Sequence, residues 1–149
     1  MKILLAVDGS KFSEAAMRML ASQIRPQDAE VLVLQVVKPI LYSTPPQMSP
    51  GYAPELAERR KERVAEAEES VSRAAQALRT AGFKVTTRVG EGEVRSGILD
   101  VAAEWGAGLF VLGSHGRTGL QRMFLGSVAE AVARHAHCSV LIARMGSTR

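Results

Sequence analysis

Apolar residues occur along this chain in two kinds of pattern that alternate with each other. Short continuous apolar runs are typical of strands that are covered on both faces of a parallel sheet. Between them, apolar positions recur every three or four residues, which predicts amphipathic helices. The runs predict strands over Ile3–Val7, Glu30–Val37, Phe83–Val89, Leu109–Leu112 and Ser139–Ala143. The third run is less apolar and more alternating than the others, so we expect it nearer to a sheet edge.

Helix start and stop signals flank the periodic segments. Ser10 is suited to cap the first helix, and Pro26 ends it. Pro54 suits the first turn of a long helix, and Gly82 suits its end. The predicted helices cover Ser13–Ile24, Pro54–Ala81, Glu93–Trp105 and a last segment from Gly126 or Ser127 to His135.

The alternation of strands and helices predicts an α/β domain with right-handed crossovers, a parallel sheet and helices on both faces. With 149 residues and neither a linker nor an internal repeat, the chain is expected to form one domain over residues 1–149. Ligands of such sheets bind beyond the carboxyl ends of the strands, where the strand order reverses. Asp8 ends the first strand and Gly113 follows the fourth, so both face one cleft if these strands are neighbours.

Charge and composition narrow the range of partners. The net charge of +4 is compatible with nucleic-acid binding, but charges of both signs are mixed over residues 58–63 and aromatic residues make up only 5%. We therefore expect no nucleic-acid partner. Cys138 is the only cysteine, which excludes an intrachain disulfide and suits the reducing cytoplasm. We interpret it as a packing residue and not as a redox sensor. No apolar run reaches membrane-spanning length, so we expect no membrane partner.

A glycine motif is the most informative candidate for chemistry. Gly113 and Gly116 follow the fourth predicted strand, and Gly126 and Ser127 open the next helix. Glycine lets backbone N–H groups approach an anion closely, and a helix N-terminus adds unpaired donors and a favourable dipole. Ser127 either caps that helix or offers its hydroxyl to a phosphate. The pattern therefore indicates a phosphate cradle, although the chain lacks a P-loop motif.

Other residues keep two interpretations open at this point. Asp8 either caps the following helix or contacts a ribose. His115 lies inside the glycine motif, but no carboxylate neighbour in the sequence supports acid–base catalysis. His135 and His137 suit the negative end of a helix dipole better than a metal site. The segment Lys38–Ala53 is either a lid over the ligand or a partner surface.

Five segments together resemble the universal stress protein family, and the resemblance covers essentially the whole chain. Its glycine motif, Gly-x2-Gly-x9-Gly-Ser, matches the ATP-binding branch of that family. Gln35 departs from the pattern, because many members carry His there. The segments are Ile3–Ser10, Leu34–Val37, Gly113–Gly119, Leu125–Glu130 and Cys138–Ile142. The resemblance implies a Rossmann-like sheet with strand order 3-2-1-4-5 and a homodimer through Val140–Ala143.

The resemblance also implies ATP, with or without Mg²⁺, as the ligand. At the nucleoside end, it implies that Ala6 and Val7 line the base pocket and that the Val36 backbone meets the adenine edge. It further implies that Asp8 and Gly113 lie at the ribose.

At the phosphate end, the implied contacts come from Gly116, Arg117, Gly126, Ser127 and Val128. The implied function is a cytoplasmic stress-response nucleotide binder that acts as a switch or sensor. The alternatives are a slow ATPase or autophosphorylating enzyme, and a partner-binding or chaperone-like module that ignores nucleotide. No Walker-type acidic residue or general base is evident, so we assign no catalytic residue and leave a metal site open.

Overall fold

The computed structural model describes residues 1–39, 52–116 and 124–145. The described strands form one parallel sheet in the order β3-β2-β1-β4-β5. The elements are β1 (Lys2–Ala6), α1 (Lys11–Gln23), a 3₁₀ turn (Pro26–Asp28), β2 (Glu30–Val37), α2 (Tyr52–Thr80), β3 (Lys84–Glu91), α3 (Val94–Trp105), β4 (Leu109–Gly113), α4 (Ser127–His135) and β5 (Ser139–Ala143). The predicted fold class and strand order are confirmed, as is the edge position of the third strand. Most of the segment Lys38–Ala53 lies outside the described residues, and so does Arg117.

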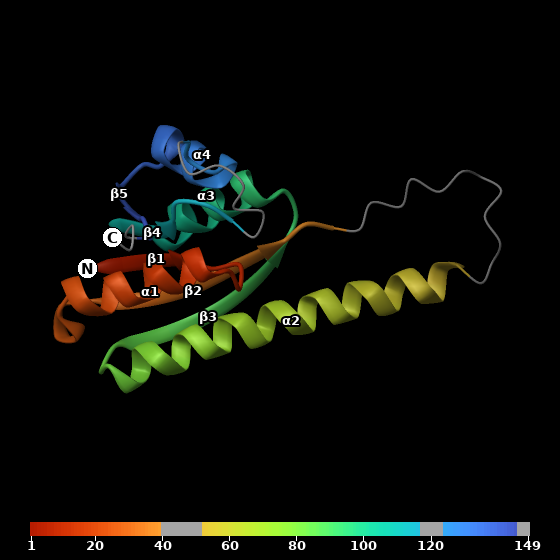
Figure 1. The fold of residues 1–149 in the computed structure, drawn as a ribbon, viewed down its shortest axis with the longest axis horizontal. Coiled ribbons are helices and arrows are strands. Elements are labelled where there is room, and N and C mark those ends of the chain that lie inside the picture. Colours follow the sequence, from red (N-terminus) through yellow and green to blue (C-terminus); the bar gives the residue numbers. More distant parts are fainter. Residues whose placement is uncertain (40–51, 117–123, 146–149) are drawn as a thin grey trace.

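Helices cover both faces of the sheet, with α1 and α2 on one face and α3 and α4 on the other (Figure 1). Successive side chains of a strand point to opposite faces. In β1, Ile3 and Leu5 therefore pack toward α1 and α2, while Leu4 packs toward α3 and α4. All three are fully buried. This two-sided burial explains why β1 is a continuous apolar run in the sequence.

The turn between β1 and α1 is fixed by its own polar groups. The Asp8 carboxylate accepts a hydrogen bond from the Ser10 N–H at 2.9 Å, and the Ser10 hydroxyl accepts one from the Ser13 N–H at 3.3 Å. Gly9 has a φ of 78°, a conformation that glycine adopts without strain. The predicted N-cap role of Ser10 is confirmed. Asp8 is thereby held at the carboxyl end of the sheet.

Helix α3 begins with a charged cap that the sequence did not reveal. Glu93 is the N-cap, and its side chain accepts hydrogen bonds from the N–H and the hydroxyl of Ser96 at 2.8 and 2.9 Å. These bonds, together with one from Arg95, lower the pKa of Glu93 to about 2. Gly106 ends the helix in the left-handed conformation, with a φ of 76°. The helix is therefore fixed at both ends and holds its first turn beside β2.

Helix α2 is long and extends beyond the carboxyl end of the sheet (Figure 1). It begins at Tyr52, so Pro54 lies in the first turn as predicted. Gly82, with a φ of 97°, follows its end. Strand β3 continues to Glu91, where the carboxylate accepts hydrogen bonds from Nε and Nη2 of Arg60 at 2.8 and 2.6 Å. This pair joins the projecting part of α2 to the sheet.

Candidate functional site

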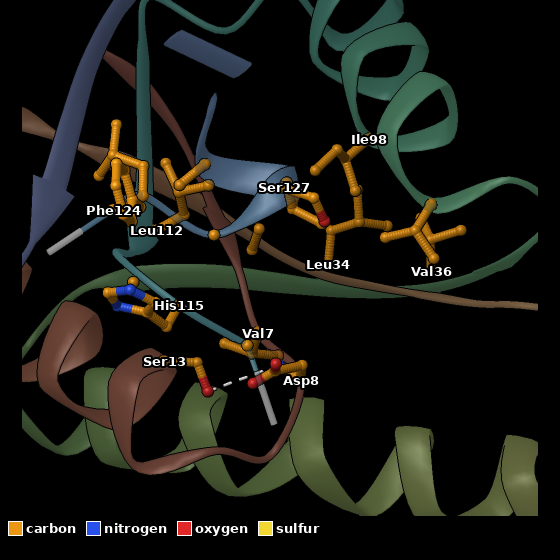
Figure 2. A pocket seen from close by; sticks show the side chains of 18 residues that line it. Val7, Asp8, Ser13, Leu34, Val36, Ile98, Leu112, His115, Phe124 and Ser127 are labelled. Carbon is orange, nitrogen blue, oxygen red and sulfur yellow. Dashed lines mark hydrogen bonds between the residues drawn. The ribbon is translucent and has the colours of Figure 1, made fainter. Parts of the chain in front are cut away.

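A cavity of about 490 Å³ lies at the carboxyl ends of β1, β2 and β4, where the strand order reverses. It is bounded by the β1–α1 turn, the first turns of α3 and the β4–α4 segment (Figure 2). β1 and β4 are neighbours, with Leu5 opposite Val111. Asp8 and Gly113 therefore face the same cavity, as the sequence predicts.

The residues expected to bind a ligand surround this cavity wherever the structure describes them. Those that line it are Ala6, Val7, Asp8, Val36, Gly113, Gly116, Gly126, Ser127 and Val128. Arg117 lies outside the described residues. The structure thus brings together positions that are separated by more than a hundred residues in the chain.

One end of the cavity is apolar. Figure 2 shows Leu34, Val36 and Ile98 grouped there, and Val94 adds to the same wall. Leu34 and Val36 are two residues apart on β2, so both point to the α3 face. Sequence reasoning missed Leu34, Val94 and Ile98 as cavity residues. The alternation along β2 was the one signal that could have identified Leu34.

The N-terminus of α4 also lines the cavity. Gly126 is the N-cap and makes no side-chain cap hydrogen bond, and its N–H donates to the Ser114 carbonyl at 2.7 Å. The first intrahelical bond runs from the Glu130 N–H to the Gly126 carbonyl. The N–H groups of Ser127 and Val128, like that of the next residue, therefore have no acceptor within the helix. The alternative in which Ser127 caps the helix is wrong, because Ser127 is already the first helical residue.

Gly113 is required by contacts within the protein itself, and Gly116 and Gly126 leave little room for a side chain. A Cβ on Gly113 would lie 2.7 Å from the carbonyl oxygen of Phe12, and a Cβ on Gly126 would lie 3.1 Å from the Ser114 carbonyl oxygen. A Cβ on Gly116 would lie 3.1 Å from Asp8 Oδ2. None of the three glycines has a positive φ. Close packing, and not backbone conformation, therefore explains why glycine occupies these positions.

Asp8 does not cap α1, because Ser10 is the N-cap, and its contact with a ribose stays a prediction. One carboxylate oxygen accepts from the Ser10 N–H, which fixes the turn, and the other lies near Gly116 on the cavity wall. The Asp8 N–H donates to the Ser13 hydroxyl at 3.4 Å. Ser13 is 6% exposed, so this second contact is well shielded from solvent.

His115 also lies on the cavity wall (Figure 2). Its Nδ1 is 2.9 Å from the Ser114 hydroxyl, and its ring lies 5.2 Å from that of Phe12. These contacts orient the imidazole. Phe124, whose side chain is 67% exposed, also lines the cavity and was not predicted there.

Two further properties concern metals and membranes. Within residues 1–39, 52–116 and 124–145, no three His, Cys, Asp or Glu side chains are grouped so that they could hold a metal ion. None of the helices described for this chain is both long and apolar enough to cross a membrane. His135 lies in the last turn of α4, where a cation is favoured by the helix dipole.

The fold and the site define a Rossmann-like α/β protein with a cavity at its switch point. The model of the universal stress protein family matches residues 1–144. A universal stress protein of Methanocaldococcus jannaschii is 35% identical over 143 residues, which are 96% of this chain and 81% of the relative. The universal stress protein YxiE of Bacillus subtilis is 34% identical over 145 residues, with 96% and 98% covered. The chain belongs to the universal stress protein family.

Solved structures of similar proteins agree with this assignment. The universal stress protein UspA from Lactobacillus plantarum superimposes with a TM-score of 0.82 at 27% identity, covering 97% of each chain. A universal stress protein from Archaeoglobus fulgidus in complex with dAMP gives a TM-score of 0.68 at 26% identity, covering 96% of this chain and 97% of the other. A universal stress protein in complex with cAMP gives 0.62 at 25% identity, covering 97% and 96%.

Proposed function

We propose that this protein binds an adenine nucleotide, and ATP in particular, in the cavity at the carboxyl end of the sheet. The observation that carries the proposal is the lining of that cavity, which combines an apolar group, Leu34, Val36 and Ile98, with the N-terminus of α4, where no side chain caps the helix. A base suits the apolar end, and a helix N-terminus is a ready anion site. The A. fulgidus relative in complex with dAMP and the relative in complex with cAMP support a nucleotide of this class.

Each residue that the sequence predicts to bind the ligand has a part in this proposal. Ala6, Val7 and Val36 line the base end, and Asp8 and Gly113 lie at the ribose. The phosphates are held by Gly116, Arg117, Gly126, Ser127 and Val128. Ser127 contributes its N–H and its hydroxyl, which is not used as the helix cap. The contacts are numerous and come largely from the backbone, which suits holding a triphosphate.

The biological role that fits is a stress-response switch or sensor in the cytoplasm, whose nucleotide state a partner protein reads. Calorimetric titration with ATP, GTP and AMP, each with and without Mg²⁺, tests the binding step. We expect ATP to bind with one site per chain, more tightly than GTP and AMP. Absence of binding by all three nucleotides would overturn the proposal, and equal affinity for ATP and AMP would show that the phosphate end is misassigned.

The proposal includes a homodimer through Val140–Ala143 of β5. This strand is at the edge of the described sheet, and Val140, Leu141 and Ile142 are only partly buried. A partly apolar edge strand suits pairing with a second copy. Light scattering coupled to size-exclusion chromatography should give twice the 16.0 kDa of one chain. A single species of 16.0 kDa at all concentrations would contradict the dimer.

A further inference from the structure

A second cavity, of about 300 Å³, lies between α1 and α2 on the other face of the sheet. The β1–α1 turn separates it from the first cavity, and Val7 and Ser13 line both. Figure 1 shows α1 and α2 side by side on this face. Ligand pockets start at about 300 Å³, so the volume suits a small molecule.

Two facing stripes of side chains line the second cavity. Their spacing of three or four residues places each stripe on one side of its helix. Helix α1 and its N-cap contribute Ser10, Ser13, Glu14 and Met17, and α2 contributes Ser70, Arg73, Ala74 and Ala77. The small side chains on α2 leave the space, while each helix brings one charge of opposite sign.

The two polar side chains that α2 contributes to this cavity, Ser70 and Arg73, have no hydrogen-bond or ion-pair partner in the part of the chain that the structure describes. Ser70 is only 7% exposed, yet its hydroxyl makes no hydrogen bond with a described residue. Arg73 likewise forms no ion pair or hydrogen bond with one. The Ser70 hydroxyl lines the cavity, so water or a ligand there can bind to it. These two groups, three residues apart on α2, are therefore suited to bind a carboxylate together.

Glu14 gives the cavity its negative group. It pairs with Arg18 at 3.3 Å, but both side chains are more than half exposed, so this ion pair is weak. The Glu14 carboxylate can therefore also accept hydrogen bonds from an ammonium group. Val7, Met17 and Ala74 supply an apolar surface in the same cavity.

We propose that the cavity between α1 and α2 binds a free amino acid with an apolar side chain. The ligand carboxylate lies at Arg73 and Ser70, its ammonium lies at Glu14, and its side chain packs on Met17. The opposite charges of Arg73 and Glu14 disfavour a simple anion or cation, because Glu14 repels an anion and Arg73 repels a cation. This site is separate from the nucleotide cavity and does not depend on nucleotide binding.

Calorimetric titration with L-leucine, L-isoleucine, L-valine and L-methionine tests the proposal. We expect at least one to bind at millimolar concentration or below. N-acetyl-L-leucine lacks the ammonium and L-leucinamide lacks the carboxylate, so both should bind more weakly than L-leucine. Absence of binding by all four amino acids, or binding of either derivative as tight as that of L-leucine, would overturn the proposal.

Variants locate the ligand. Arg73→Gln should weaken binding by about tenfold or more, since hydrogen bonds to charged groups contribute that much. Arg59→Gln is the matched control, because Arg59 is an exposed arginine of the same helix that pairs with Glu55 outside the cavity. Ala77→Leu fills the cavity from an exposed helix position and should abolish amino-acid binding while ATP binding is unchanged. If Arg73→Gln and Arg59→Gln bind alike, or Ala77→Leu binds as the parent does, the site lies elsewhere and the proposal fails.

Discussion

At the scale of single residues, the glycine motif serves the packing of the protein as well as a ligand. Sequence reasoning explains Gly113 and Gly126 by the approach of an anion. The structure adds that Gly113 touches the Phe12 backbone and that Gly126 touches Ser114. These contacts join segments distant in sequence, so no local pattern predicts them. Substituting these glycines therefore tests folding before it tests binding.

Gly113→Ala should lower the free energy of unfolding by about 1–3 kcal/mol, the usual cost of forcing an extra carbon into a packed site. The new Cβ would lie 2.7 Å from the Phe12 carbonyl carbon and oxygen. Gly108→Ala is the control, because its Cβ would meet nothing closer than 3.8 Å. Urea unfolding of both variants checks this. Equal stability of the two variants would contradict this prediction and show that the Phe12 backbone can move to make room for the new Cβ.

Ser127→Ala should weaken ATP binding by about two- to tenfold, because one hydrogen bond to phosphate is lost. Its unfolding free energy should change by no more than about 0.5 kcal/mol, as for a surface position, since Gly126 caps α4. Ser10→Ala provides the contrast, because Ser10 is a true N-cap whose loss costs about 1 kcal/mol. Calorimetry and urea unfolding together separate the two serines. Unchanged ATP affinity in Ser127→Ala would remove this hydroxyl from the site.

At the scale of elements, the sequence predicts each strand and long helix, because each strand is an apolar run and each helix has apolar residues at every third or fourth position. The prediction is off by one or two residues at several ends. β3 continues to Glu91, where an ion pair with Arg60 and pairing with β2 extend the strand. The 3₁₀ turn at Pro26–Asp28 was not predicted, because three residues carry no periodic signal. The charged cap of α3 was missed because glutamate is an unusual N-cap.

The Glu93 cap makes the stability of α3 depend on pH. Its pKa falls from 4.5 to about 2 in the folded protein. A carboxylate with a lowered folded-state pKa stabilises the fold fully above its unfolded pKa and loses that contribution as the pH falls through the folded pKa. Glu93→Gln should therefore have a lower melting temperature than the parent at pH 7. The difference should narrow as the pH falls from 4.5 toward 2.

Thermal unfolding measured between pH 7 and pH 3 checks the role of Glu93. Asp100→Asn is the control, since Asp100 is an exposed carboxylate of the same helix outside the first turn. A constant difference between the parent and Glu93→Gln over this range would contradict the charged cap.

At the scale of the whole molecule, the strand order places the β1 and β4 ends together and creates the switch-point cavity. The resemblance to a family supplied that order, since hydrophobic pattern alone does not rank the strands. The residues of the glycine motif and Asp8 could be assigned to one site on that basis. The apolar wall at Leu34 and Ile98, and the whole second cavity, depend on how helices pack on the sheet. The packing between helices that are distant in the chain cannot be predicted from a single sequence.

The central claim is that an adenine nucleotide lies with its base at Val36 and its phosphates at the start of α4. Comparing the amide chemical shifts of the ¹⁵N-labelled protein with adenosine and with ATP tests it most directly. Both ligands should shift the amides of Val36 and Ile98, and only ATP should shift those of Ser127 and Val128. If ATP leaves the Ser127 and Val128 amides unmoved, the phosphates lie elsewhere and the account is contradicted.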